Sequence, residues 1–309
     1  MTLRETVAES RAAPKDGAGG WRSLLDIAGL KLEVTGDRSI PLLGVEGAKG
    51  PFVISDGIPD ASVKATVGAP GDVPGGRKLF DAGATWQLFD DAGTLVYVFR
   101  ALAFGDRPTR RAAFSRDFSR GEVLVHPDVL RPGQPLDPLW YPLDELLVGN
   151  LLAQGRGVMT HACGLVDPEG RGQLFVGSSG AGKTTMARLW QGVKGVKILS
   201  DERIVLRREG GRVWIYGTPW PGEGGMASPA KAPLARVYFL KKAPRIGSRR
   251  LGTIDAVARF FPCCFPPYHD AAAVAFTLGF LEEIAGEVPC RELEVVPDAG
   301  IVSYILKES

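Results

Sequence analysis

A glycine-rich segment near the middle of the chain constrains the fold more than any other feature. Leu174-Phe-Val176 is apolar and prone to form a short buried β-strand. It leads into Gly177-Ser-Ser-Gly-Ala-Gly-Lys-Thr184, which fits the spacing G-x-x-x-x-G-K-[S/T]. A helical pattern that includes Met186 and Trp190 follows. A strand, a loop of this spacing and a helix, in this order, are typical of a phosphate-binding loop.

The residue types in this loop are those that phosphate binding requires. Glycines let successive backbone N–H groups turn toward an anion, and the following helix adds the positive end of its dipole. Lys183 would supply a positive charge for the β- and γ-phosphates, and the Thr184 hydroxyl is a ligand for Mg²⁺. We therefore predict a nucleoside triphosphate site, although a simple glycine-rich turn is the alternative. Its candidate residues are Gly177, Ser178, Ser179, Gly180, Ala181, Gly182, Lys183, Thr184 and Thr185.

Composition and charge describe an ordinary globular protein. The 309 residues include 45% hydrophobic and 23% charged residues, and the formal net charge is +2, so nothing global indicates nucleic acid or an anionic membrane as partner. No apolar run is long enough for a membrane span or a signal peptide. The four cysteines show no metal-binding spacing, and a disulfide framework is not expected. We predict a cytoplasmic protein.

Charge is distributed unevenly along the chain. Residues 1–150 carry a net charge of −3, and residues 151–309 carry +5. The half that holds the glycine-rich loop is the basic half, which suits anionic substrates. A solvated basic face explains the excess equally well. The stretch from Lys231 to Arg250, which contains no acidic residue, has the same two interpretations.

The pattern of apolar residues divides the chain into three parts. Residues 1–20 lack apolar periodicity and are predicted to be a disordered arm. Residues 21–135 are predicted to form a mainly β N-terminal domain, with alternating segments at 30–34 and 61–67 and a hairpin around 90–93. This part holds no compact catalytic constellation and is expected to serve as a scaffold or a substrate wall.

Residues 136–309 are predicted to form an α/β domain. A helix over 143–154 and a strand over 157–163 precede the glycine-rich loop, and this strand is expected to form a hairpin with 174–176, which makes the sheet mixed. A long Gly- and Pro-rich loop is expected at 217–233. Further strands are predicted at 196–199, 204–206, 213–216, 237–240 and 293–296, and helices at 253–261 and 270–285.

Three features beyond the loop are candidates for chemistry. Asp201 and Glu202 follow a predicted strand, where carboxylates can bind Mg²⁺ or accept a proton, although a capped turn with solvated acids is the alternative. His161 lies in the strand before the loop, and on composition alone it is more typical of a core histidine. Trp220 and Glu223 lie in the 217–233 loop and are candidates to close over a substrate.

The order of these motifs resembles a known superfamily. His161, the glycine-rich loop and Ser200-Asp-Glu-Arg203 are similar to the motifs of the HPr kinase/phosphorylase and ATP-dependent phosphoenolpyruvate carboxykinase superfamily. The HPr-kinase-related proteins of bacterial gene clusters are more similar still. Segments at 142–146, 158–164, 217–220, 237–240 and 288–293 also resemble them, so that the resemblance runs from about residue 80 to the end of the sequence.

The resemblance implies a mixed-sheet P-loop kinase core of the HPr kinase/phosphoenolpyruvate carboxykinase type over residues 136–309. It also implies ATP and Mg²⁺ as cofactors, with Thr184, Asp201 and Glu202 at the metal. His161, Lys183, Asp201 and Glu202 would be the catalytic residues. Two features depart from the family. The second acid is Glu202 where an aspartate is usual, and the phosphorylase signature segment is not recognisable, which argues against phosphorylase activity and against HPr as substrate.

We predict a kinase that transfers the γ-phosphoryl group of ATP to a hydroxyl, such as a serine of a peptide or protein encoded in the same gene cluster. Either Asp201 or Glu202 would accept the hydroxyl proton. Candidate substrate residues are Arg203, Trp220, Glu223 and Lys231. One alternative is a kinase of a small molecule, such as free serine. Another is a nucleotide-binding regulatory module without phosphotransfer.

Overall fold

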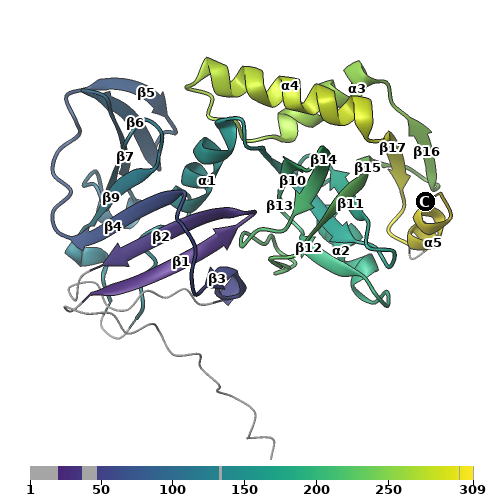
Figure 1. Cartoon of the computed structure of the whole chain (residues 1–309), viewed down its shortest axis with the longest axis horizontal. Helices are drawn as coiled ribbons and strands as arrows, with labels where there is room; N and C mark the ends of the chain where they lie inside the picture. Colours follow the sequence, from purple (N-terminus) through teal and green to yellow (C-terminus); the bar gives the residue numbers. More distant parts are fainter. Residues whose placement is uncertain (1–19, 37–46, 132–133, 299, 309) are drawn as a thin grey trace, which may run out of the picture.

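The computed structural model describes residues 20–36, 47–131, 134–298 and 300–308. Its strands form two mixed β-sheets, and α1 (Leu143–Ala153) lies between them (Figure 1). The arm predicted at residues 1–20 lies outside the described residues except for Gly20. The predicted division into domains at residue 135 stays a prediction, although the two sheets fall on either side of it.

Within the described residues, the first sheet has nine strands in the order β3-β1-β2-β4-β9-β8-β7-β6-β5. Strand β4 runs parallel to both of its neighbours, and the other pairs are antiparallel. Residues along β2 are alternately buried and half-buried, as the predicted alternation requires. The strands are β1 (Trp21–Ile27), β2 (Leu30–Gly36), β3 (Val53–Ile54), β4 (Ala61–Val67), β5 (Arg77–Asp81), β6 (Trp86–Asp91), β7 (Thr94–Phe99), β8 (Arg110–Phe114) and β9 (Arg120–Val125).

Short 3₁₀ helices follow three strands of the first sheet, β2, β7 and β9. They are η1 (Gly47–Phe52), η2 (Leu102–Phe104) and η3 (Pro127–Val129). Of these, η1 carries Lys49 and anchors Phe52 in the core against the sheet.

The second sheet follows the order β11-β10-β13-β14-β15-β17-β16, and β12 pairs with β10. Because β11 also pairs with β15, five of these strands close into a ring. The predicted hairpin is present, since β10 and β11 pair antiparallel, whereas β15 runs parallel to β11 and β17. The strands are β10 (Val158–Val166), β11 (Gly172–Val176), β12 (Lys197–Ser200), β13 (Arg203–Glu209), β14 (Arg212–Tyr216), β15 (Lys231–Lys242), β16 (Gly247–Arg250) and β17 (Cys290–Val295).

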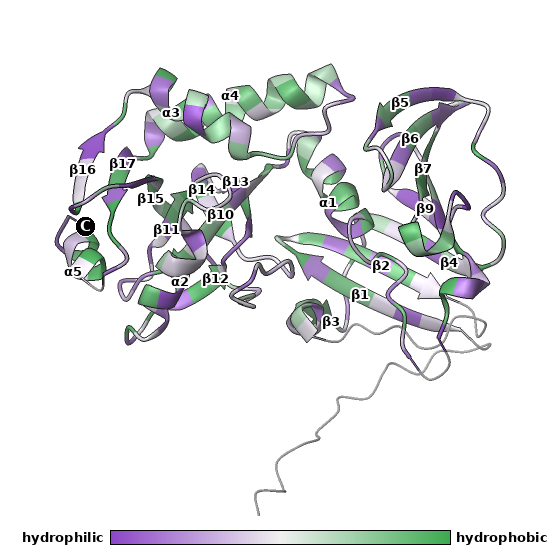
Figure 2. Cartoon of the chain, turned by 180° about the vertical axis from the view of Figure 1, so that it is seen from behind, coloured by the Kyte–Doolittle hydropathy of each residue, from purple (hydrophilic) through white to green (hydrophobic). Residues whose placement is uncertain are grey.

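Helices cover both faces of this sheet. On one face, α3 (Thr253–Phe260) and α4 (Ala271–Glu287), joined through η4 (Phe261–Cys263), pack on strand residues such as Leu174 and Val176. On the other face, α2 (Lys183–Gln191) and α5 (Gly300–Glu308) pack against Phe175 and Tyr238. A strand buried on both faces carries a continuous apolar run, which is the pattern of β11. Figure 2 shows the hydrophobic residues that α4 carries along most of its length.

Helix α1 is buried on more of its surface than the single apolar face of an amphipathic helix. The sequence predicts one apolar face through Leu143, Leu146, Leu147 and Leu151, and all of these are buried except Leu146, which is half-buried. Val148, Gly149 and Leu152 are buried as well, because the helix packs against the first sheet and against Met159 and Val205 of the second. Among the described helices, none is long and apolar enough to cross a membrane.

Three differences from the sequence prediction concern the second sheet. Strand β15 begins at Lys231, so the Gly- and Pro-rich loop covers 217–230 instead of 217–233. Strand β16 was not predicted because its sequence, Gly-Ser-Arg-Arg, is polar, but Arg249 pairs with Glu292 on neighbouring β17. Helix α5 was not predicted either, and Ile301 and Ile305 bury its inner face.

The position of α1 makes a prediction about stability. We expect Leu147→Ala to lower the free energy of unfolding by about 2–5 kcal/mol, because it leaves a cavity between α1 and the sheets. Urea unfolding followed by circular dichroism measures this change. The control Leu102→Ala removes a side chain that is 91% exposed and should change stability by less than about 0.5 kcal/mol. Equal effects of the two substitutions would contradict the packing described here.

Candidate active site

Most of the predicted site residues meet around one cavity of about 960 Å³, whereas Gly177, Ser178, Ala181, Asp201 and Lys231 do not line it. It lies where the glycine-rich loop (residues 177–184), the turn between β12 and β13 and the N-terminal end of α1 come together. Its wall includes Ser179, Gly180, Gly182, Lys183, Thr184, Thr185, His161, Glu202, Arg203, Trp220 and Glu223 from the predicted set. The segments that bring these residues together are far apart in the sequence.

The glycine-rich loop folds around the Lys183 ammonium group. The Lys183 Nζ donates hydrogen bonds to the carbonyls of Gly177 and Ser178, at 3.0 and 3.1 Å. Gly182 has a φ of 106°, which only glycine adopts without strain, and it precedes the first residue of α2. A Cβ on Gly177 would lie 2.6 Å from the Cβ of Ala181. The loop therefore depends on glycine at both of its ends.

Asp201 is fully buried and organises the surrounding backbone. Its carboxylate accepts hydrogen bonds from the amides of Gly222 at 2.9 Å, Gly224 at 2.8 Å and Met226 at 3.4 Å. The Thr184 hydroxyl lies 3.4 Å from Asp201 Oδ2. Within the part of the chain that the structure describes, no Lys, Arg or His forms an ion pair with this carboxylate. Asp201 thus joins the start of α2 to the 217–230 loop.

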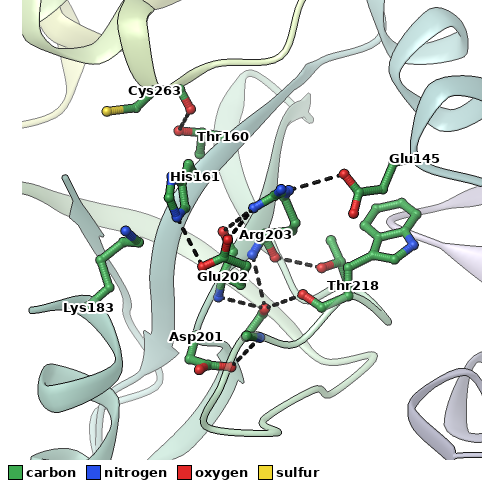
Figure 3. A network of polar contacts seen from close by, with 12 residues as sticks. Glu145, Thr160, His161, Lys183, Asp201, Glu202, Arg203, Thr218 and Cys263 are labelled. Atoms are coloured by element: carbon green, nitrogen blue, oxygen red, sulfur yellow. Dashed lines mark hydrogen bonds and ion pairs between the residues drawn. The ribbon is translucent and has the colours of Figure 1, made fainter. Parts of the chain in front are cut away.

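Glu202 points away from Asp201 and into the cavity. One of its oxygens lies 3.0 Å from His161 Nε2, and the other accepts a 2.7 Å hydrogen bond from Arg203 Nη1 (Figure 3). Arg203 also donates to Glu145 at 3.2 Å and stacks on the ring of Phe265. His161 can sit beside Glu202 because β10 and β13 pair with His161 opposite Arg203.

The local charges shift the pKa values of these groups. Burial lowers the pKa of His161, the nearby Lys183 charge lowers it further, and Glu202 partly opposes both effects. Burial also lowers the pKa of Lys183. For Glu202, burial acts to raise the pKa, but the Arg203 hydrogen bond and the His161 charge outweigh it, and the net shift is downward. At neutral pH the site therefore presents a neutral imidazole beside an ionised carboxylate.

The 217–230 loop forms part of the cavity wall. Thr218 Oγ1 donates to the carbonyl of Arg203 at 2.6 Å, and Trp220 Nε1 donates to Asp144 Oδ2 at 2.9 Å. Trp220 is only 6% exposed, so it anchors the loop in addition to lining the cavity. Glu223 lines the cavity farther along the loop. Closure of this loop over a substrate stays a prediction.

The structure does not bring Lys231 to this site. Its ammonium group pairs with Glu209 at 2.6 Å and lies over the rings of Trp214 and Tyr216, at the start of β15. Lys231 does not line the cavity. Its position indicates that it stabilises the pairing of β14 and β15.

Several cavity residues were not predicted from the sequence. Lys49 of η1 pairs with Asp137 and, at 2.5 Å, with Asp144, and both acids line the cavity with Glu145. The acids raise the pKa of Lys49 although burial opposes them. Asp144 and Glu145 begin an otherwise apolar helix, and two acids in that position were the available signal. For Lys49 the sequence offers no signal.

No protein-family model and no curated protein matches the chain. Among solved structures, the chain is similar to the HPr(Ser) kinase/phosphatase from Coxiella burnetii, with 13% sequence identity and a TM-score of 0.28. The match covers 48% of this chain and 88% of that chain. A match this distant carries no conclusion about the function of the chain, and the resemblance predicted from the sequence stays a prediction.

The charges around His161 make a prediction about its titration. We expect NMR titration to give His161 a pKa below its ordinary value. Lys183→Met should raise this pKa because it removes a nearby positive charge, and Glu202→Gln should lower it because it removes the carboxylate that favours the imidazolium. Glu223→Gln is the control and should leave it unchanged. A wild-type pKa above the ordinary value would contradict the neutral imidazole.

Proposed function

We propose that the protein is an ATP- and Mg²⁺-dependent kinase that transfers a phosphoryl group to a hydroxyl, the acceptor being a serine of a peptide or protein. The observation that carries this proposal is the convergence on one cavity of Lys183, Thr184 and the Glu202–His161 pair, with the buried Asp201 carboxylate directly behind Thr184. A P-loop, a metal-binding hydroxyl and carboxylate, and a base are the parts that phosphoryl transfer requires.

The residues beside the glycine-rich loop fit a magnesium ion. Thr184 and Asp201 offer a hydroxyl and a carboxylate, which are hard oxygen ligands. The Asp201 charge is compensated by backbone amides and by no cation of the described chain, so it keeps a net negative charge that would attract Mg²⁺. The described residues contain no cluster of three or more acidic, His or Cys ligands, and Mg²⁺ at nucleotide sites takes its remaining ligands from water and phosphates. When bound, the ion would neutralise phosphate charge.

A second cavity would suit the nucleotide base. Its volume is about 410 Å³, and it shares Gly180, Gly182 and Thr185 with the main cavity. Its outer wall is mainly apolar, with Met186 and Val296 among its residues. Phosphates held by the glycine-rich loop would thus have an apolar surface on one side, which suits the nucleotide base. On the other side they would have the Glu202 side chain, where the acceptor hydroxyl would lie.

Glu202 fits the role of base better than Asp201. The Glu202 carboxylate reaches the cavity, whereas the Asp201 carboxylate is fully buried and bonded to three amides. The hydroxyl oxygen of the acceptor would form a bond to the γ-phosphorus while the bond from that phosphorus to the ADP oxygen breaks. Glu202 would take the hydroxyl proton, and Lys183 would stabilise the charge on the transferred group.

The size of the cavity leaves room for a segment of a peptide or protein acceptor beside the phosphates. A volume of 960 Å³ lies near the upper end of the roughly 300–1,000 Å³ typical of small-molecule sites. The nucleotide base would occupy the second cavity and would not fill this one. Phosphates and one free amino acid would leave much of this space unfilled. An extended segment of polypeptide would fill it.

Nucleotide binding gives the first test of this function. We expect Lys183→Met to weaken ATP binding by at least tenfold in calorimetry, because the substitution removes the ammonium group that would bind the phosphates. Lys194→Met removes an exposed lysine that does not line either cavity and should leave the affinity unchanged. Unchanged affinity in both variants would show that the loop does not bind the phosphates.

The base assignment is tested by separating binding from transfer. Incubation with labelled ATP, Mg²⁺ and a library of serine-containing peptides, with free serine alongside, should label peptides. Glu202→Gln should reduce labelling by about 10²–10⁴-fold while ATP affinity changes little. Labelling that survives this substitution would exclude Glu202 as base. Label in water alone, with every acceptor, would favour the regulatory module instead of a kinase.

A further inference from the structure

A separate cavity lies across one wall of the candidate active site. Its volume is about 230 Å³, and Tyr141, Glu145 and Arg203 line both cavities. Because Arg203 binds the proposed base Glu202, this wall is one side chain removed from the proposed point of transfer. Neither the nucleotide nor the acceptor hydroxyl, as placed above, occupies the smaller cavity.

The lining of this cavity is aromatic. Phe80 and Trp86 of the first sheet stack with their ring centroids 5.1 Å apart, and Tyr97 lies 5.7 Å from Trp86. On the opposite side, Phe265 and Tyr268 precede α4 and complete the wall together with Pro266 and Pro267. The first sheet, α1 and the segment before α4 therefore build the cavity jointly.

Among the polar groups in its wall, Asn150, Tyr97, Glu145 and Arg203 are bonded to other protein groups, and burial lowers the pKa of His269, which favours its neutral form. Asn150 Nδ2 donates to Tyr97 Oη at 3.1 Å and to the carbonyl of Leu146 at 2.7 Å. Glu145 accepts from Arg203 at 3.2 Å. A charged ligand would have to break these bonds, whereas an apolar group would not. The chemistry of the wall thus favours an apolar occupant.

Two features indicate that the occupant comes from outside the chain. Tyr141 and Tyr268, both in the wall, are 64% and 55% exposed, which is unusual for large rings beside an apolar cavity and typical of binding surfaces. The cavity is also small. A cavity of about 150 Å³ is enough to bind benzene, and drug-sized ligands need about 300 Å³ or more, so 230 Å³ suits a single side chain.

We propose that this cavity is a specificity pocket for an aromatic or branched aliphatic side chain of the polypeptide acceptor, one to three residues from the phosphorylated hydroxyl. The proposal rests on the kinase function proposed above. An extended chain advances about 3.3–3.6 Å per residue, so neighbouring residues can reach both sides of a wall one side chain thick. The pocket also gives the first sheet a role, because Phe80, Trp86 and Tyr97 select the acceptor.

Binding of a side-chain analogue tests the pocket without phosphotransfer. The protein is labelled with 5-fluorotryptophan, the Trp86 signal is assigned with Trp86→Phe, and N-acetyl-phenylalanine amide is titrated with ¹⁹F NMR detection. We expect a saturable shift of the Trp86 signal and none with N-acetyl-aspartate amide. Tyr268→Ser should weaken the binding about three- to tenfold, since it removes one aromatic wall. Ile254→Ser, which removes an exposed apolar side chain outside the pocket, should not.

Peptide labelling tests the role of the pocket in selection. In the serine-peptide library, we expect labelled sequences to carry an aromatic or branched aliphatic residue at a fixed offset from the serine. Tyr268→Ser should reduce this preference while ATP affinity stays unchanged. Labelled peptides without such a preference, or a Trp86 signal that does not move, would overturn the proposal. A saturable shift of the Trp86 signal with no labelled peptide would support side-chain binding in the pocket and would count against the kinase function.

Discussion

The site depends on one buried negative charge. Moving a carboxylate out of water costs several kcal/mol unless hydrogen bonds or cations compensate it. Asp201 obtains that compensation from the backbone amides of Gly222 and Gly224, with the Thr184 hydroxyl nearby. A Cβ on Gly224 would lie 2.6 Å from the Asp201 carboxylate, so a glycine is needed for this approach. The start of α2, the acid turn and the 217–230 loop are consequently positioned by the same carboxylate.

A second network connects this unit to the first sheet. Asp144, at the start of α1, binds Lys49 of η1 and accepts the indole hydrogen of Trp220. Arg110 of β8 is fully buried between the rings of Phe99 and Trp140, and it donates to two carbonyls of the segment before α1. Charged groups inside a core hold one geometry because each needs its partners. The residues opposite the glycine-rich loop therefore owe their position to contacts between the two sheets.

The sequence was most informative where pattern and chemistry are local. The strand–loop–helix at 174–190, the hairpin of β10 and β11 and the adjacent acids Asp201 and Glu202 follow from short-range spacing. The different environments of those two acids could not be predicted, because the 222–226 amides reach Asp201 only through the folded loop. Lys49 and the aromatic cavity depend on how distant segments pack. Lys231 lies outside the main cavity, and its ammonium group pairs with Glu209 of β13, on the far side of β14.

The groups proposed to bind phosphate and part of the aromatic wall come from different sheets. The glycine-rich loop, Asp201 and Glu202 all belong to residues 158–242, whereas the aromatic wall takes Phe80, Trp86 and Tyr97 from the first sheet. Substitutions in β5, β6 and β7 would therefore alter part of the proposed pocket without touching the groups proposed to bind phosphate. In evolutionary terms, this part of the proposed choice of target can diverge independently, whereas Arg203 and Tyr268 tie the rest of the pocket to the segments of the second sheet.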